Sequence, residues 1–251
     1  MSTPIVLVHA FPENAQMWNP VVQRLTQADR EVVTFDLPGY GEKAQAELPA
    51  EPDLAFFVAE LLSVLDQVDA ESFILGGLSL GGYVTLAALP TVAPRLAGVI
   101  LADTKASADP QPAVEVRLQF AQRAETEGVD WIPEAMLPTV VAAETFTDRP
   151  EVIDELTGLM LAAPAASVAW TQRAMAKRPD THDNLAELDV PVLVIVGEHD
   201  QGAPIAAAQA MADTASNSQL VVIDGVGHMS SNEDPDAFAA AISDWLISNS
   251  L

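Results

Sequence analysis

The sequence contains no cysteine, which excludes disulfides, thiolate metal sites and a cysteine nucleophile. Basic residues are also scarce. The chain has 11 Lys and Arg against 36 Asp and Glu, for a formal net charge of −25. Such a field repels phosphate backbones, so we expect no nucleic-acid partner, and it disfavours polyanionic substrates. An acidic surface also suits high salt, although ordinary acidic solubility is the simpler interpretation.

Long apolar runs are missing as well. No window approaches the roughly 18 to 20 apolar residues of a membrane span. The first stretch, MSTPIVLVHAFP, has no basic region, and its apolar run is too short for a signal peptide. We therefore expect a cytoplasmic protein without a membrane partner. The 251 residues, 49% of them hydrophobic, suffice for one large α/β domain or a domain with an insertion.

Short apolar runs alternate with longer helical patterns along the chain. The runs are nearly continuous in Val, Ile and Leu, as in parallel strands buried on both faces. The predicted strands are 5–9, 31–36, 72–78, 96–103, 190–197 and 219–224. The predicted helices between them are 17–29, 53–69, 80–93, 204–213 and 235–249. This alternation indicates an α/β fold with a doubly wound, mostly parallel sheet.

One interval breaks the alternation, between the strands at 96–103 and 190–197. It contains no convincing strand, and a structureless loop of that length is improbable in a compact domain. Its patterns predict helices at 111–128, 130–142, 149–163 and 165–177. We therefore expect a core formed by 1–108 and 182–251, with a helical cap inserted at 109–181. The insertion leaves the sheet at the carboxyl end of a strand, the edge where such sheets bind ligands.

A single serine stands between glycines where a predicted strand meets a predicted helix. Residues 77–81 read Gly-Leu-Ser-Leu-Gly, the G-x-S-x-G spacing of a nucleophile at a sharp strand-to-helix turn. Residues two before and two after the serine crowd each other there, which favours glycine at both places. The following helix aims its first amides at the serine, so the Leu80 N–H is free to stabilise an oxyanion. Ser79 is the candidate nucleophile.

A serine needs a base, and four histidines are available. His9 ends the first strand, His182 lies in a polar stretch that predicts a solvated loop, and His199 follows a strand end. Only His228, in the loop before the last helix, comes after both a nucleophile candidate and an acid that follows a strand. Asp200 is the favoured acid. Asp103 is the alternative acid, with turn capping as its other interpretation, and Glu198 is a third choice.

A second oxyanion donor is expected from the loop after the first strand, His-Ala-Phe-Pro-Glu-Asn. The donor is the Phe11 amide, since Pro12 has no N–H, and the Phe11 ring is expected to line the substrate pocket. Asp36 and the glycines of Asp-Leu-Pro-Gly-Tyr-Gly, at 36–41, are expected to organise a turn beside the site.

Taken together, these motifs resemble the α/β-hydrolase superfamily over the whole chain. The cap stretches WIPEAMLP and AMAKRPDT resemble 3-oxoadipate enol-lactonases and cofactor-free haloperoxidase-like esterases. The resemblance implies a sheet of about six parallel strands without the usual N-terminal hairpin. Ala10 stands where a glycine is usual, which is tolerable if its φ is negative. Gln-Gly-Ala-Pro follows Asp200 where a Thr-Pro helix start is common, a change expected to affect capping.

The resemblance implies a serine hydrolase that cleaves a small-molecule ester or lactone through an acyl-enzyme, with no metal or other cofactor. A C–C bond hydrolase or a haloperoxidase or perhydrolase-like enzyme with the same triad is the alternative, and a non-catalytic binding protein is a third possibility. Apolar cap residues are possible substrate-pocket residues beside Phe11, although each also suits the cap's own core. They are Phe120, Trp131, Met136, Met160 and Trp170. Arg117, Arg123 and Arg173 are candidates for recognising a carboxylate, or lie on solvated helix faces.

Overall fold

The computed structural model describes residues 3–251, and these form one six-stranded sheet whose paired strands are all parallel. The sheet order is β2-β1-β3-β4-β5-β6. The strands are β1 (Ile5–Val8), β2 (Val32–Phe35), β3 (Phe73–Leu78), β4 (Leu96–Ala102), β5 (Val192–Gly197) and β6 (Ser218–Ile223). Every predicted strand is present, and the predicted α/β fold is confirmed.

The outer strands differ from the prediction of burial on both faces. Strands β1, β3 and β5 are buried throughout, and β4 nearly so. By contrast, β2 is half-buried along its whole length, and most of β6 is exposed or half-buried. The prediction was wrong for these two strands because each lies at an edge of the sheet, where one side has no neighbouring strand.

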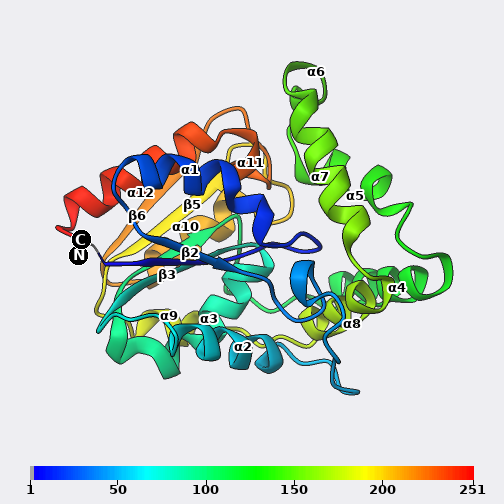
Figure 1. Ribbon diagram of the computed structural model, residues 1–251, viewed down its shortest axis with the longest axis horizontal. Helices are drawn as coiled ribbons and strands as arrows, with labels where there is room; N and C mark the ends of the chain where they lie inside the picture. Colours follow the sequence, from blue (N-terminus) through cyan, green and yellow to red (C-terminus); the bar gives the residue numbers. More distant parts are fainter. Residues whose placement is uncertain (1–2) are drawn as a thin grey trace.

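Helices cover both faces of the sheet (Figure 1). The core helices are α1 (Asn19–Gln27), α2 (Ala55–Leu65), α3 (Leu80–Val92), α9 (His182–Ala186), α10 (Ile205–Thr214), α11 (Ser230–Glu233) and α12 (Pro235–Ser248). Short 3-10 helices are η1 (Ala15–Trp18), η2 (Gly41–Lys43) and η3 (Ala93–Arg95). Helices α1 and α12 pack together on one face, while α2, α3 and α9 line the other. Helix α3 is apolar on nearly all sides, as its central place against β1, β3 and β4 requires.

Six helices lie between β4 and β5 in the chain, and the first five of them gather beyond one end of the sheet, at the right of Figure 1. These five are α4 (Gln111–Glu127), α5 (Ile132–Val140), α6 (Thr145–Asp148), α7 (Pro150–Ala162) and α8 (Ala165–Ala176). The cap boundaries at 109 and 181 stay a prediction. Within residues 3–251 no single helix has the length and hydropathy of a membrane span, although α7 and α8, bent by 94° at their junction, pass as a pair.

Candidate active site

The turn between β3 and α3 places Ser79 in an unusual backbone conformation. Its φ is 56° and its ψ is −111°, a backbone conformation that residues other than glycine rarely adopt. The Ser79 N–H donates to Ala102 O at 2.9 Å, and Thr104 Oγ1 donates to Ser79 O at 2.9 Å. The end of β4 and the segment after it therefore hold the N–H and the C=O of Ser79, whose side chain is part-exposed.

The glycines on either side of Ser79 are required by close backbone contacts. A Cβ on Gly77 would lie 2.2 Å from the carbonyl carbon of Gly81. A Cβ on Gly81 would lie 2.0 Å from Val8 O, on the neighbouring strand. Neither distance is compatible with a side chain. The predicted crowding of the residues two before and two after the serine is thus present, and β1 adds to it.

Three side chains from separate loops form a continuous hydrogen-bonded chain. Ser79 Oγ lies 2.8 Å from His228 Nε2. His228 Nδ1 lies 2.8 Å from each oxygen of Asp200. Ser79 follows β3, Asp200 follows β5 and His228 follows β6. Because these strands are parallel, their carboxyl ends lie at the same edge of the sheet. Serine, imidazole and carboxylate in this order can form a nucleophile, a base and an orienting acid.

The surroundings of His228 favour its charged form. Burial alone would lower the pKa of His228, but the charge and hydrogen bond of Asp200 and the charges of Asp103 and Glu13 raise that pKa above its usual value. Asp200 is itself buried, and its Oδ1 accepts from the N–H groups of Gly202 and Ala203 at 2.7 and 2.9 Å. Asp200 thereby organises the segment Gln-Gly-Ala-Pro before α10, which has no side-chain cap of its own.

The other two candidate acids have different partners. Asp103 is buried, accepts from Gly197 N at 2.9 Å and accepts a hydrogen bond from the Ser230 hydroxyl. Burial and the charge of Asp200 raise the pKa of Asp103 above its usual value. Glu198 is about half-exposed and accepts from Gly225 N at 2.9 Å. Of the three acids, Asp200 is the one hydrogen-bonded to His228, and the Asp103 contacts bind the His228 loop to β5 instead of capping a turn.

The remaining histidines do not join this chain. His9 is buried between Ala10 O, 2.7 Å from its Nδ1, and the Leu37 N–H, 3.0 Å from its Nε2. Burial lowers the pKa of His9 to about 4, so it stays neutral. His199 is about half-exposed. His182, predicted in a solvated loop, instead begins α9, where Asp180 accepts from its backbone N–H and faces its Nδ1.

The two predicted oxyanion donors follow neighbouring strands of the sheet. Leu80 is the first residue of α3, and Phe11 follows β1, the strand paired with β3. Among residues 3–251 neither backbone N–H has a protein acceptor. Ala10 is not among the residues with positive φ, which meets the condition for replacing the usual glycine. The peptide between Phe11 and Pro12 is cis.

Asp36 orders the turn that follows β2. Its two carboxylate oxygens accept from Ala15 N at 2.8 Å and from Glu42 N at 2.7 Å. Gly41 has a φ of +50°, and a Cβ there would lie 2.2 Å from Asp36 Oδ2. Asp36 therefore acts on the backbone of two loops, the structural role expected for the motif at 36–41.

Glu13 is a functional candidate that the sequence reasoning missed. Its side chain is fully buried, and within the described chain neither carboxylate oxygen has a hydrogen-bond partner. Burial raises the pKa of Glu13 to about 7, with the nearby His228 acting in the opposite direction. A buried carboxyl without donors is unusual. The only signal in the sequence was its place, two residues after Phe11.

Glu233 is the second missed residue, in the short helix α11 that follows His228. Its Oε1 accepts from Gly227 N at 2.7 Å, and its Oε2 accepts from Ala142 N at 2.8 Å and from Thr145 Oγ1 at 2.6 Å. One buried carboxylate thus joins the His228 loop to the segment between α5 and α6. Two of its three partners, Ala142 and Thr145, lie 91 and 88 residues away in the sequence, so no local motif predicts this role.

The predicted substrate-pocket residues divide into separate groups. The Phe11 and Phe120 ring centroids lie 6.0 Å apart, and those of Phe120 and Trp131 lie 4.6 Å apart, so aromatic contacts run from the loop after β1 into α4 and the start of α5. Trp170 instead packs on Phe56 and Phe57 of α2. Met160 is fully buried, and Met136 is half-buried. Their contact with a substrate stays a prediction.

The three arginines considered for carboxylate recognition are all paired within the protein. Arg117 binds Asp109, Arg123 binds Glu127, and Arg173 binds Glu125 with two hydrogen bonds. Arg123 and Arg173 make these pairs on exposed surfaces. The structure therefore assigns them intramolecular partners.

Comparison with known proteins identifies the family. The Alpha/beta hydrolase family matches residues 5–241. The chain is 27% identical to 3-oxoadipate enol-lactonase 1 of Acinetobacter baylyi over 243 residues, covering 96% of this chain and 88% of that protein.

Two solved structures are also similar. A thermophilic esterase from Thermogutta terrifontis, solved with malate bound, superposes with a TM-score of 0.93 at 36% identity, covering 99% of this chain and 91% of that one. The enol-lactonase from Burkholderia xenovorans LB400 superposes with a TM-score of 0.88 at 26% identity, covering 98% and 92%. The chain belongs to the alpha/beta hydrolase family, and it is a hydrolase enzyme.

Proposed function

We propose that the protein is a serine hydrolase that cleaves a small carboxylic ester or lactone. The observation that carries the proposal is the hydrogen-bonded chain from Ser79 through His228 to Asp200. The residues of this chain have the types, the order and the distances that acyl transfer requires. The esterase and the enol-lactonase described above support an ester or lactone as the substrate class.

The reaction proceeds in two acyl-transfer steps. Ser79 Oγ attacks the substrate carbonyl carbon while His228 Nε2 accepts the hydroxyl proton, and the collapse of the tetrahedral intermediate transfers that proton to the leaving alcohol. A water molecule then attacks the ester carbonyl of acyl-Ser79, with His228 again as base, and releases the acid. In a lactone the alcohol and the acid belong to one molecule, so a single hydroxy acid is released.

Asp200 and two backbone amides assist these steps. Asp200 holds the proton on His228 Nδ1, which leaves Nε2 free to accept from Ser79, and its charge stabilises the imidazolium. The N–H groups of Phe11 and Leu80 are the oxyanion donors, each typically worth about 3 kcal/mol in the transition state. The helices α4–α8 form the cap, and the rings of Phe11, Phe120 and Trp131 line the acyl side of the pocket.

The first test uses a serine-directed fluorophosphonate probe and a nitrophenyl ester. We expect the wild type to be labelled and active, and Ser79→Ala to lose labelling and at least about 10³-fold in kcat/KM. The matched control is Ser248→Ala, an exposed serine in α12 that should retain both properties. Equal labelling of the wild type and Ser79→Ala would rule out this nucleophile.

A substrate panel tests the reaction class. Nitrophenyl esters of increasing acyl length, simple lactones and 3-oxoadipate enol-lactone are compared with a C–C bond substrate and a peracid assay. We expect turnover of at least one ester or lactone. Turnover confined to the C–C substrate or to the peracid assay would refute ester or lactone hydrolysis while leaving Ser79 as the nucleophile.

A further inference from the structure

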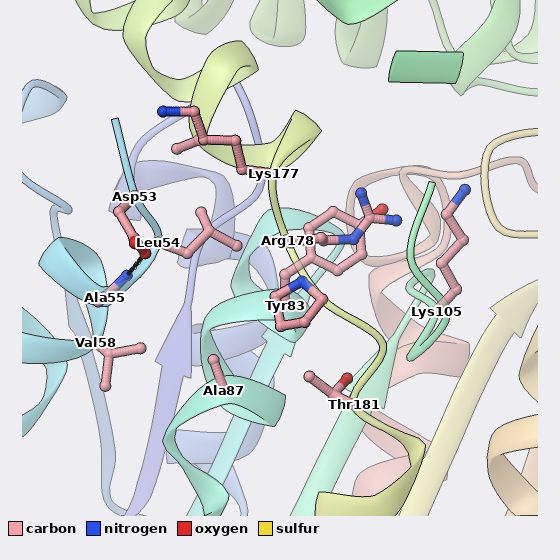
Figure 2. A pocket seen from close by; sticks show the side chains of 12 residues that line it. Asp53, Leu54, Ala55, Val58, Tyr83, Ala87, Lys105, Lys177, Arg178 and Thr181 are labelled. Atoms are coloured by element: carbon pink, nitrogen blue, oxygen red, sulfur yellow. Dashed lines mark hydrogen bonds between the residues drawn. The ribbon is translucent and has the colours of Figure 1, made fainter. Parts of the chain in front are cut away.

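A cavity lies between helices α2, α3 and α8 (Figure 2). Its volume is about 250 Å³, and none of Ser79, Asp200 and His228 lines it. It lies between the start of α2, the outward side of α3, the segment after β4 and the end of α8. We call it the α2–α8 pocket. Its lining residues are Asp53, Leu54, Ala55, Val58, Tyr83, Ala87, Lys105, Ala174, Lys177, Arg178, Pro179 and Thr181.

More than half of this lining is apolar or aromatic. Leu54, which directly precedes α2, and Val58 of α2 lie across the space from Tyr83 and Ala87 of α3 (Figure 2). These walls provide contact for a hydrocarbon group and give it few hydrogen-bonding partners. A space of this size lies just below the usual range for drug-sized ligands, so it suits a molecule of roughly eight to ten non-hydrogen atoms.

Basic residues are concentrated around the pocket, in a chain that has only 11 of them. Lys105, Lys177 and Arg178 line the pocket, against the single acid Asp53. One Asp53 oxygen already accepts from Ala55 N at 2.8 Å. Among the lining residues the basic side chains outnumber the acidic ones, in contrast to the net charge of −25 for the whole chain. Charge complementarity therefore favours an anionic ligand at this one place.

Each cation of the lining has an acidic partner, but these partners are exposed or shared. Lys177 pairs with the exposed Glu51 at 3.6 Å. Arg178 has a side chain only 4% exposed, stacks over the Tyr83 ring at 4.1 Å and binds both oxygens of Asp109. The same Asp109 also pairs with Lys105 and Arg117, so one carboxylate serves three cations. In addition, Arg178 Nε is buried and, within residues 3–251, has no hydrogen-bond partner.

We propose that the α2–α8 pocket binds small aliphatic monocarboxylates, with the hydrocarbon tail between α2 and α3 and the carboxylate toward the basic residues. A single carboxylate fits better than a polyphosphate, because the lining is mostly apolar and includes Asp53. The inference does not depend on the chemistry at Ser79.

The test is a chemical-shift titration of ¹⁵N-labelled protein with hexanoate at constant ionic strength and pH, with hexan-1-ol as the neutral comparison. We expect saturable shifts of residues that line the pocket, with a Kd on the order of 1 mM, and at least tenfold weaker binding of the alcohol. Absence of saturation below about 50 mM, or saturable shifts confined to the loops of Ser79 and His228, would overturn the proposal.

Variants test the location and the charge separately. Ala87→Phe fills the pocket and is expected to weaken hexanoate binding at least tenfold, whereas Ala166→Phe, on an exposed position of α8, should leave it unchanged. If Ala87→Phe fails to fold, Ala55→Phe blocks the pocket from an exposed position of α2. Lys105→Gln combined with Lys177→Gln should weaken hexanoate binding about tenfold and leave hexan-1-ol unaffected.

Each result is decisive. Equal hexanoate binding by the wild type and by a folded pocket-filling variant would place the ligand elsewhere. Equal affinity for the alcohol and the carboxylate would show that the pocket does not select negative charge, and it would refute the proposal of an anionic ligand. The fluorophosphonate experiment above is independent, since a protein that fails to label at Ser79 can still bind hexanoate here.

Discussion

At the scale of single residues, His228 has three carboxyl groups near it, whereas a catalytic triad requires one. Asp200 is hydrogen-bonded to it, while Asp103 and Glu13 act on it only through their charges. Both additional carboxyls are buried, and burial raises the pKa of each. An ionised Glu13 stabilises the imidazolium of His228, so its protonation state affects how readily the base is available.

Replacing Glu13 with glutamine should stabilise the protein in a pH-dependent way. Because the pKa of Glu13 is raised from 4.5 to about 7, its ionisation above pH 7 opposes folding by on the order of 3 kcal/mol. The contribution is absent below about pH 4.5, where the carboxyl is protonated in both states, and it grows as the pH rises to 7. We expect Glu13→Gln to match the wild type near pH 4.5 and to exceed it in urea unfolding at about pH 8.

The same variant should change the pH dependence of catalysis. Loss of a negative charge near His228 lowers the pKa of His228, so the acidic limb of kcat/KM should move to lower pH. Glu198→Gln, at a half-exposed acid, is the control and should move neither curve. A stability difference that is constant between pH 4.5 and 8 would contradict the assigned protonation of Glu13.

The sequence identifies some of these residues and not others, for a physical reason. Ser79 is found because its strained turn requires glycines at fixed spacing, and His228 and Asp200 because each follows a strand in a set chain order. Glu13 is defined by its burial without a hydrogen-bond partner among the described residues, and Glu233 by its contacts with Ala142 and Thr145, which are distant in sequence. Their environment exists only once the chain has folded, so spacing does not reveal them.

At the scale of elements, the loop that carries His228 is anchored on several sides. Glu233 binds it to the segment after α5, the Ser230 hydroxyl binds Asp103 after β4, and Met229 N donates to Val140 O at 2.9 Å. Helix α11 is thus a junction between the core and the helices α5 and α6. The position of the base depends on contacts with the proposed cap.

Truncation of Glu233 should therefore destabilise the protein and impair catalysis together. Glu233→Ala leaves three buried donors without an acceptor, so we expect the free energy of unfolding to fall by about 3 kcal/mol. We also expect kcat for a nitrophenyl ester to fall more than KM rises, because the histidine loses its fixed position. Denaturant unfolding and steady-state kinetics give the two measurements.

Glu198→Ala provides the comparison, since it removes one hydrogen bond at a half-exposed site. Its expected cost is below about 1 kcal/mol, with kcat unchanged. If Glu233→Ala were as stable and active as this control, the junction at α11 would have no role in placing His228.

The long elements were predictable and the short ones were not. The strands were located by their nearly continuous apolar runs, and the longer helices by their helical patterns. Helices α6, α9 and α11 have only four or five residues, too few to display a period, and they were missed. The partial exposure of β2 and β6 was also missed. These strands contain apolar runs like those of the inner strands, and they differ in lying at the edges of the sheet.

At the scale of the whole molecule, the charge of −25 leaves most acids without a basic partner. Several basic residues form ion pairs, and three of them gather around Asp109. The remaining surface repels itself, which destabilises the compact state at low ionic strength.

Salt should therefore stabilise this protein. Raising NaCl from about 0.02 to 0.5 M shortens the screening length from over 20 Å to under 5 Å, so we expect the Tm to rise by several degrees. Calorimetry at pH 7 measures this, and KCl should act equally if screening is the cause. A Tm that falls with salt would show that the ion pairs outweigh the repulsion.

The placement of six helices between two paired strands also affects when the enzyme can become active. Strand β4 cannot pair with β5 until all of α4–α8 has been synthesised, and His228 is synthesised later still. A nascent chain that already carries Ser79 and its turn has no base to activate the hydroxyl. The proposed nucleophile therefore lacks its proposed base until the last loop packs onto the sheet, and we expect Ser79 to be unreactive during most of translation.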